Sequence, residues 1–395
     1  MMRAAGNALD GTKYRGTWVV EVGEIRLARR AAFGEDSEGV MDLPRGVTSQ
    51  ERPSEGDLSS VWGEAVAVLG QSVTAGGADP FATVRSDLLV TEQFLREQLA
   101  DEDPLMQELG LHLLNGGGKR LRPALVLLSG QATGGHVDQL TPVAAACELI
   151  HMATLVHDDL VDESVRRRGV PTIHARWGVP VAVLFGDHLF ARAFSVLAQY
   201  STPGIVRIMS DVVARMCAGE IAELQAQWDV ETTEDAYFVR VHAKTGHFIG
   251  ECCRMGARAA GSSPAVEQAL AAFGTHMGTC FQVVDDILDL VADEAVLGKP
   301  TGSDLRSGVY TLPVLRALAG SSGDPLRQIL AHKPLDANAV RLVQELVRRS
   351  DGLDYAQEKA LGLARSAQQS LATLPPNAYR NALSTLSEEL VRRVV

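Results

Sequence analysis

Six aspartates form two copies of one pattern, Asp-Asp-x-x-Asp. The first copy holds Asp158, Asp159 and Asp162, and the second, 127 positions later (285 − 158), holds Asp285, Asp286 and Asp289. The sequence before each copy is apolar and poor in glycine, which predicts helices. On a helix the first and last carboxylates of each copy lie on one face, about one turn apart. Mg²⁺ prefers such oxygen ligands and fills its remaining positions with waters and substrate phosphates. Two such motifs could hold a metal-bound diphosphate between them.

A plainer interpretation is that these aspartates cover solvated helix faces. The flanking segments, 149–156 and 281–284, are too apolar for that interpretation, because stretches of this composition are normally interior. Acidic side chains in such helices are costly unless cations neutralise them. The sequence therefore favours a metal site at both motifs.

Basic residues gather in short loops, as a phosphate site requires. Lys119 and Arg122 follow the glycines at 116–118. Glycine allows close backbone approach, lysine supplies a point charge, and arginine supplies a two-pronged donor for phosphate oxygens. A nucleotide-binding loop would need Ser or Thr after the lysine, and Arg120 stands there instead. The alternative is an ordinary basic start of a helix.

Further cations follow the two motifs. Arg167 and Arg168 come shortly after Asp162, and Lys299 comes ten residues after Asp289. Carboxylates near the C-terminus of a helix are disfavoured by its dipole, and a metal ion with neighbouring arginines would relieve that placement. Lys244-Thr245 lies between the motifs. A lone lysine near a helix end is usually a solvated cap, so these residues gain meaning only from the whole set.

This combination suits the removal of diphosphate from an allylic carbon. Mg²⁺ and convergent Lys and Arg side chains stabilise the departing negative charge. No Ser-His-Asp or Cys-His arrangement stands out, and the reaction requires none if a carbocation forms. A second basic pocket would bind the diphosphate of an acceptor whose double bond attacks that cation.

At this point the sequence resembles the trans-isoprenyl diphosphate synthase (polyprenyl synthetase) family over roughly residues 85–390. The resemblance rests on both aspartate motifs and on shorter matches, namely Gly118-Lys119-Arg120-Leu121-Arg122-Pro123, Arg167-Arg168-Gly169, Lys244-Thr245 and Phe281-Gln282. It implies an all-α fold with a central cavity, Mg²⁺ as cofactor and a homodimer. The medium- and long-chain enzymes of the family are the nearest in type.

The resemblance also implies roles for single residues. Isopentenyl diphosphate would bind to Lys119, Arg122, His151 and Arg168. The allylic diphosphate would contact Arg167, Lys244, Thr245, Gln282 and Lys299. Asp158, Asp162 and Asp285 would lead the ligation of Mg²⁺. A single histidine in an apolar helix is more often a core residue, but His151 lies seven residues before Asp158, two turns along the same face.

Two positions depart from the family pattern. Many members carry Gly-Lys-x-Thr-Leu-Pro after the second motif, and here Val309 replaces the lysine. Members also often carry Gly-Glu-x-x-Gln, and here Glu223 replaces the glutamine. All six aspartates remain, so we expect activity.

Small residues precede the first motif. Ala153 and Thr154 stand five and four positions before Asp158, where short-chain members carry a bulky aromatic residue that closes the product pocket. This predicts products longer than C20, in the C30 to C50 range, and Ala153→Phe should shorten them. The alternative is that these residues only allow close packing of helices.

Composition limits the remaining possibilities. The chain has 395 residues, 46% hydrophobic, and a net charge of −12 spread along it, which argues against a nucleic-acid partner. Residues 1–75 lack periodicity and predict a flexible extension, whereas residues 76–395 predict a single all-α domain of ten or more helices. No apolar run reaches the length of a membrane span. Contact with a membrane would then be transient, during product release.

The five cysteines lack zinc-site spacing and are expected as buried residues in a reducing cytosol. No secretory signal is expected at the start, so we predict a cytoplasmic protein. Two rival functions remain open at this stage. One is a class I terpene cyclase, which usually carries a different second metal motif. The other is a regulatory subunit without catalysis, which would typically have lost the aspartates.

Overall fold

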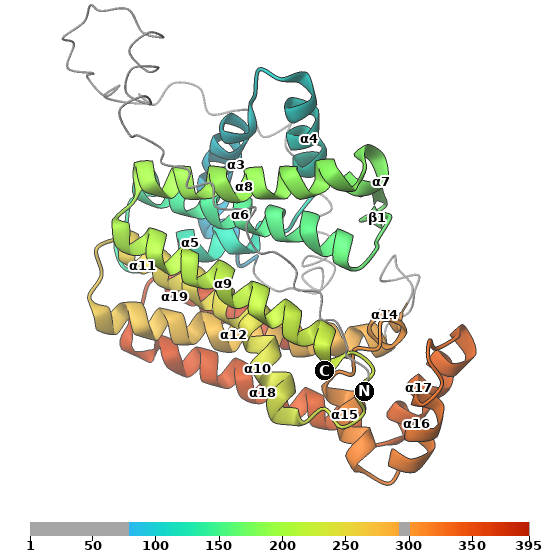
Figure 1. Cartoon of the computed structure of the whole chain (residues 1–395). Helices are drawn as coiled ribbons and strands as arrows, with labels where there is room; N and C mark the ends of the chain where they lie inside the picture. Colours follow the sequence, from blue (N-terminus) through green and yellow to red (C-terminus); the bar gives the residue numbers. More distant parts are fainter. Residues whose placement is uncertain (1–78, 292–300, 395) are drawn as a thin grey trace, which may run out of the picture. The chain divides into compact units, whose positions relative to one another are not determined.

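The computed structural model describes residues 79–291 and 301–394, and helices dominate both stretches (Figure 1). The only strands in these stretches are β1 (Arg166–Arg167) and β2 (Val170–Pro171), which pair antiparallel in a two-residue hairpin. The predicted all-α class is confirmed. The predicted extension, 1–75, and the boundary at residue 76 lie outside the described residues.

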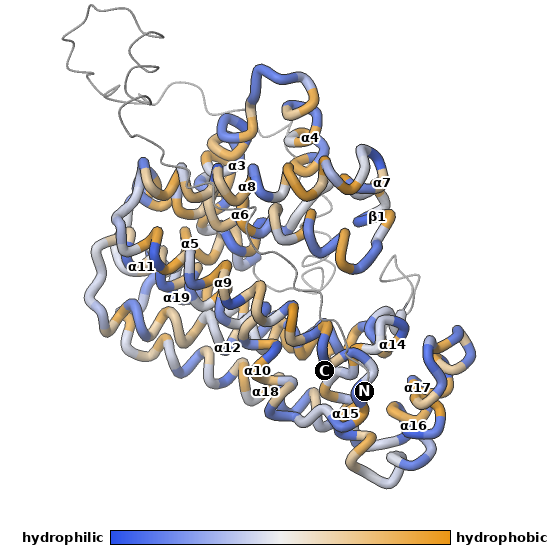
Figure 2. Tube along the Cα trace, in the orientation of Figure 1, coloured by the Kyte–Doolittle hydropathy of each residue, from blue (hydrophilic) through white to orange (hydrophobic). Residues whose placement is uncertain are grey.

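Five helices form the centre of the fold: α5 (Leu121–Ala132), α6 (Val137–Val161), α11 (His247–Ala259), α12 (Pro264–Val291) and α18 (Gly352–Ser370). Most residues of α5 and of the first four turns of α6 are buried, because these segments are apolar on every side. Figure 2 shows hydrophobic and hydrophilic residues alternating along most of the helices, as expected of helices with one buried face.

The other elements surround this centre. They are η2 (Ala82–Val84), α3 (Arg85–Leu99), α4 (Pro104–Asn115), α7 (Ile173–Trp177), α8 (Val179–Tyr200), α9 (Pro203–Ala226), α10 (Glu234–Val241), η3 (His242–Gly246), α14 (Ser303–Arg306), α15 (Leu312–Ala319), α16 (Gly323–Leu330), α17 (Ala337–Arg349), η4 (Leu371–Thr373) and α19 (Ala378–Val391).

The directions of α6 and α12 bring the two aspartate motifs to one end of the helical body. Both helices run from left to right in Figure 1, and each carries its motif in its last turns. The arginine hairpin of β1 and β2 follows α6 at that end. Helix α9 also ends there, before α10 and η3 lead back towards α11.

Among the described residues, α6 and α8 are long and apolar enough to cross a membrane by length and composition, although the sequence contains no uninterrupted apolar run of that length. In α6, 78% of the most apolar window is buried inside the protein, so its composition is that of a core helix. In α8 the buried share is only 39%. The cysteines were also predicted incompletely: Cys147, Cys252, Cys253 and Cys280 are buried, but Cys217 on α9 is exposed.

Candidate active site

The first aspartate motif lies at the C-terminal end of α6. Asp158 and Asp159 belong to its last turn, and Asp162 caps it, with its amide donating to the Asp158 carbonyl at 2.8 Å. Burial raises the pKa of Asp158 to about 7, with Glu220 and Asp162 adding to the effect and Lys244 opposing it. Burial also raises the pKa of Asp162. The motif therefore holds carboxylates that are poorly solvated and incompletely neutralised.

Asp159 differs from its two neighbours because it has a protein partner. Arg167, on β1, donates from Nε to the Asp159 carboxylate at 2.8 Å. This bond ties the arginine hairpin to the end of α6. Within the described residues, the side chains of Asp158 and Asp162 have no such hydrogen bond, so they are the two free carboxylates of the motif.

The second motif shows the same division of roles. Asp286 accepts a hydrogen bond from the Tyr237 hydroxyl at 2.6 Å and another from Gln282 at 2.9 Å. Asp289 accepts from the hydroxyl of Ser303 at 2.7 Å, and backbone amides at the start of α14 point at the same carboxylate. These two aspartates hold the surrounding elements in place. Asp285 is exposed, and no described residue donates to its carboxylate.

Lys244 and Thr245 enter the site through an irregular turn. The chain forms a π-helix over η3, between α10 and α11, a distortion frequent at functional sites. Lys244 Nζ lies 2.8 Å from carboxylate oxygens of both Glu220 and Glu223 on α9. These two acids raise the pKa of Lys244 although burial opposes them. Its positive charge in turn lowers the pKa values of Asp158 and Asp162.

A chain of hydrogen bonds joins Lys244's neighbour to the second motif. The Thr245 hydroxyl donates to Gln282 at 3.0 Å, and Gln282 donates to Asp286. The negative charge of Glu223 also raises the pKa of both Asp162 and Asp304, which lies just beyond the second motif. Charged residues of α6, α9 and η3 therefore interact in one site, and the hydrogen bonds of Thr245 and Gln282 join α12 to it.

Two arginine side chains pack against the basic loop that precedes α5. Arg120 adopts a left-handed conformation with φ of 46°, and its buried guanidinium pairs with Glu92 on α3 at 2.8 Å and with Glu148 on α6 at 3.0 Å. A side chain at Gly118 would meet Arg120 Nη1 at 2.8 Å and Arg168 Nη1 at 3.3 Å. A side chain at 118 would therefore displace the Arg120 guanidinium and crowd that of Arg168, which donates to the carbonyl of Gly117.

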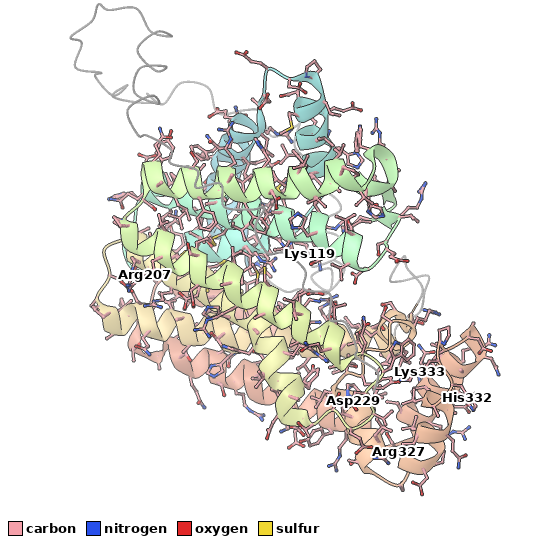
Figure 3. All side chains as sticks on the ribbon, in the orientation of Figure 1. Lys119, Arg207, Asp229, Arg327, His332 and Lys333 are labelled. Carbon is pink, nitrogen blue, oxygen red and sulfur yellow. The ribbon has the colours of Figure 1, made fainter. Side chains whose placement is uncertain are left out.

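Three cations and one histidine gather behind this loop. Burial, together with the charges of Arg393 and Arg168, lowers the pKa of Lys119 to about 8. Lys119 (Figure 3) forms no ion pair within the described residues. Arg122 is half-buried, with its guanidinium carbon 4.9 Å from the centre of the Phe248 ring, and its enclosed Nε atom has no hydrogen-bond partner among the described residues.

His151 completes this basic group. It is half-buried, its enclosed Nδ1 atom lacks a partner, and desolvation with the charges of Arg122 and Arg168 holds its pKa well below the usual value. The structure thus brings together the four residues expected to bind isopentenyl diphosphate. Within the described residues Lys119, Arg122 and Arg168 form no ion pair with a carboxylate, so their positive charge is available to an anion.

Sequence reasoning missed several residues of the site. Arg393, in the last turn of the described chain, acts on Lys119 from 274 positions away (393 − 119). Tyr237 and Arg240, on α10, reach Asp286 and Glu223. No short motif marks these residues. Among the expected residues, Lys299 lies outside the described residues.

The positions before the first motif are both on α6. Ala153 is fully buried, whereas Thr154 is partly exposed and donates its hydroxyl to the His151 carbonyl at 2.8 Å. Of the two, Thr154 is the residue with accessible space beside it.

Comparison with known proteins assigns the chain to a class. The family model described as Polyprenyl synthetase matches residues 103–347, so the chain belongs to this family. The helical fold, the paired aspartate motifs and the neighbouring basic residues are consistent with that assignment.

Individual relatives agree with the family. The chain is 38% identical over 325 residues to nonaprenyl diphosphate synthase of Mycobacterium tuberculosis, which covers 81% of this chain and 96% of that protein. It is 35% identical over 310 residues to a short chain isoprenyl diphosphate synthase of Methanothermobacter thermautotrophicus, covering 77% and 95% of the two chains. The crystal structure of a decaprenyl diphosphate synthase from Rhodobacter capsulatus superimposes with a TM-score of 0.76, 32% identity and coverage of 80% and 98%. The protein is a trans-polyprenyl diphosphate synthase.

Proposed function

We propose that this enzyme uses Mg²⁺ to condense isopentenyl diphosphate head to tail with an allylic diphosphate. This proposal is supported by three motif carboxylates that no described residue donates to, Asp158, Asp162 and Asp285, and by the cation Lys119, on which the charge of Asp285 acts. The pKa of Asp158 is raised to about 7, and the pKa of Lys119 is lowered to about 8. A divalent cation would reverse the first shift, and a diphosphate would reverse the second. A metal ion and a diphosphate are thus the kinds of ligand whose charges would stabilise these two groups.

The carboxylates suit Mg²⁺. Asp158, Asp162 and Asp285 are the three motif aspartates that no described side chain or amide occupies, and we assign them as metal ligands. In the described residues no three acidic, histidine or cysteine groups converge closely enough to enclose an ion. Phosphate oxygens and waters would therefore complete the coordination, as Mg²⁺ prefers. When bound, the ion would neutralise charge that develops on the leaving diphosphate.

The allylic substrate would lie between the motifs. We assign Arg167, Lys244, Thr245 and Gln282 to its diphosphate. As the C–O bond breaks, its electron pair leaves on the diphosphate, and these cations and donors stabilise the negative charge. Asp159 and Asp286 act by holding Arg167 and Gln282 in position.

The acceptor would occupy the basic group. Lys119, Arg122, His151 and Arg168 would fix the diphosphate of isopentenyl diphosphate so that its double bond faces the allylic carbon. The double bond then supplies the electrons of the new C–C bond, and transfer of a proton from the neighbouring carbon to the departed diphosphate restores a double bond. A neutral His151 would donate one hydrogen bond to a phosphate oxygen.

We propose products longer than C20, in the C30 to C50 range. The small residues Ala153 and Thr154 leave α6 without a bulky side chain below the first motif. The partial exposure of Thr154 supports an open path along this helix. Relatives named for long products agree with this proposal, whereas one relative is named as a short chain synthase. Sizing of the products distinguishes the two types of enzyme.

We further propose that two copies of the chain pair through α8. This helix is apolar, yet it exposes Val179, Val183 and Leu184, the last to 69%. A twofold homodimer would cover that face. We place the enzyme in the cytoplasm, where its five free cysteines would remain reduced. Contact with a membrane would be transient, when product leaves, and we propose no nucleic-acid partner.

Substitution of the assigned ligands tests this function. Asp158→Ala or Asp285→Ala should lower turnover about 100-fold or more, because removal of electrostatic stabilisation of this kind costs about 3 kcal/mol in the barrier. Circular dichroism should show an intact fold. Turnover within about threefold of wild type would refute the assignment of these aspartates.

A further inference from the structure

Lys244 is held by more negative charge than a substrate-binding cation needs. Both Glu220 and Glu223 place a carboxylate oxygen 2.8 Å from its ammonium group. Two carboxylates can neutralise one ammonium group and leave one negative charge over. Such an excess would repel a diphosphate at the place where Lys244 should attract it.

A buried arginine on the neighbouring helix compensates for this excess. Arg240 is only 7% exposed, and its Nε lies 3.3 Å from the Glu223 carboxylate. The distance is long for a charge-assisted hydrogen bond, but burial strengthens the attraction. Glu223 therefore stands between two cations, Arg240 and Lys244.

The other contacts of Arg240 keep it at the edge of the site. Its Nη2 donates to the Tyr310 carbonyl at 3.4 Å, and its guanidinium carbon lies 5.8 Å from the centre of the Tyr237 ring. Its charge also acts on Asp286. Tyr310 follows Val309, the position where many family members carry a lysine. Arg240 thus brings positive charge beside the segment that has lost it.

We propose that Arg240 is a positioning residue for the allylic diphosphate. By neutralising Glu223, it leaves the Lys244 ammonium group available to a phosphate oxygen. Glu223 and Arg240 then form one functional pair in which neither member is useful alone. This inference rests on the proposed assignment of Lys244 to the allylic substrate.

A merely structural role for Arg240 predicts a different result. Removing one member of a buried ion pair leaves the other charge unpaired and destabilises the protein. Such a loss would lower the melting temperature without separating the two substrates. A double-mutant cycle distinguishes the two roles, because it measures whether loss of Arg240 acts through Glu223.

The experiment compares wild type with Arg240→Met, Glu223→Gln and the double variant. Affinity for an unreactive allylic thiolodiphosphate is measured by calorimetry with Mg²⁺, and KM is measured for both substrates. We expect Arg240→Met to weaken allylic binding about 10- to 100-fold, the value of a charge-assisted phosphate contact. The KM for isopentenyl diphosphate should stay within about twofold. The double variant should recover allylic affinity to within about threefold of wild type.

Arg258→Met is the matched control. Arg258 on α11 pairs with Glu267 on α12 at 3.0 Å, near the turn between these helices and away from the aspartate motifs. Its loss should lower the melting temperature and leave allylic affinity unchanged. If Arg240→Met does not fold, the double variant, which removes both charges, still has to fold and bind as wild type does.

Two results would overturn the inference. One is a double variant that binds the allylic analogue no better than Arg240→Met. The other is an equal loss for both substrates. Failure of the proposed function is recognised separately, since wild type itself would then not elongate an allylic diphosphate.

Discussion

Replacement of Asp158 by asparagine should stabilise the metal-free protein while it abolishes activity. Burial raises the pKa of Asp158 from its usual 3.8 to about 7 in the folded state. In the folded protein this carboxyl therefore holds a proton that the unfolded chain has released between these two pH values. The free energy of unfolding consequently falls as pH rises from about 4 to 7, and above pH 7 the ionised carboxylate destabilises the folded state.

The size of the effect follows from that shift. About three pKa units correspond to about 4 kcal/mol at most, since each unit is worth about 1.4 kcal/mol. Relaxation around the charge reduces the figure, and we expect Asp158→Asn to gain about 1 to 3 kcal/mol in free energy of unfolding at pH 8. At pH 4 the gain should vanish, because Asp158 is then protonated in wild type.

Urea denaturation in EDTA at pH 4 and pH 8 measures this difference. Adding millimolar Mg²⁺ at pH 8 should stabilise wild type and leave Asp158→Asn nearly unchanged, because ligands stabilise only the state that binds them. Asp159→Asn is the comparison: it keeps an oxygen that can accept from Arg167 but loses the ion pair, and because Arg167 offsets part of the effect of burial on the Asp159 pKa, it should gain less stability than Asp158→Asn at pH 8. An Asp158→Asn protein no more stable than wild type in EDTA at pH 8 would refute the reasoning.

Three further predictions concern the pockets and the surface. Lys119→Ala and Arg168→Ala should raise KM for isopentenyl diphosphate about 10- to 100-fold, and should raise KM for the allylic substrate much less. Steady-state kinetics with each substrate varied in turn measures both values. Equal effects on the two substrates would show that the residues are assigned to the wrong substrate. Thr154→Phe should shorten the products, and Ala153→Phe, at a fully buried position, should shorten them and also lower the melting temperature. Product lengths are measured by chromatography after dephosphorylation. Identical lengths for wild type and both variants would show that these residues do not line the product path. Leu184→Glu should convert a dimer into monomers in light scattering, and an unchanged mass would move the interface away from α8.

The helical class and the two motifs could be predicted from the sequence because both depend on local patterns. The spacing in Asp158 to Asp162 and Asp285 to Asp289 reports a helix face directly. Apolar flanks showed that these helices are interior. The expected grouping of Lys119, Arg122, His151 and Arg168 also agrees with the structure, since each lies next to a recognisable motif.

The division of labour within the motifs could not be predicted. Asp159, Asp286 and Asp289 have the same side chain as their neighbours. Their structural role is visible only in the folded protein, where they accept hydrogen bonds from Arg167, Tyr237 and Ser303. Arg240 and Arg393 escaped notice for the same reason. Their partners are distant in sequence, and an isolated arginine in a helix has no local signature.

The exposed face of α8 shows a second limit. Hydropathy makes α6 and α8 look alike, but most of α6 is covered by other helices and most of α8 is not. Which apolar helix becomes central depends on packing, which is set by the whole chain. For Ala153 and Thr154, likewise, the sequence identified small residues but could not tell which one has space beside it.

Incubation of the purified protein with Mg²⁺, farnesyl diphosphate and labelled isopentenyl diphosphate tests the central claim most directly. Extracted products are dephosphorylated and sized by chromatography. We expect label in all-trans prenyl chains longer than C20, and no such label when EDTA is present. Hydrocarbon formed from farnesyl diphosphate alone, or no incorporation of label by a folded protein, would contradict it.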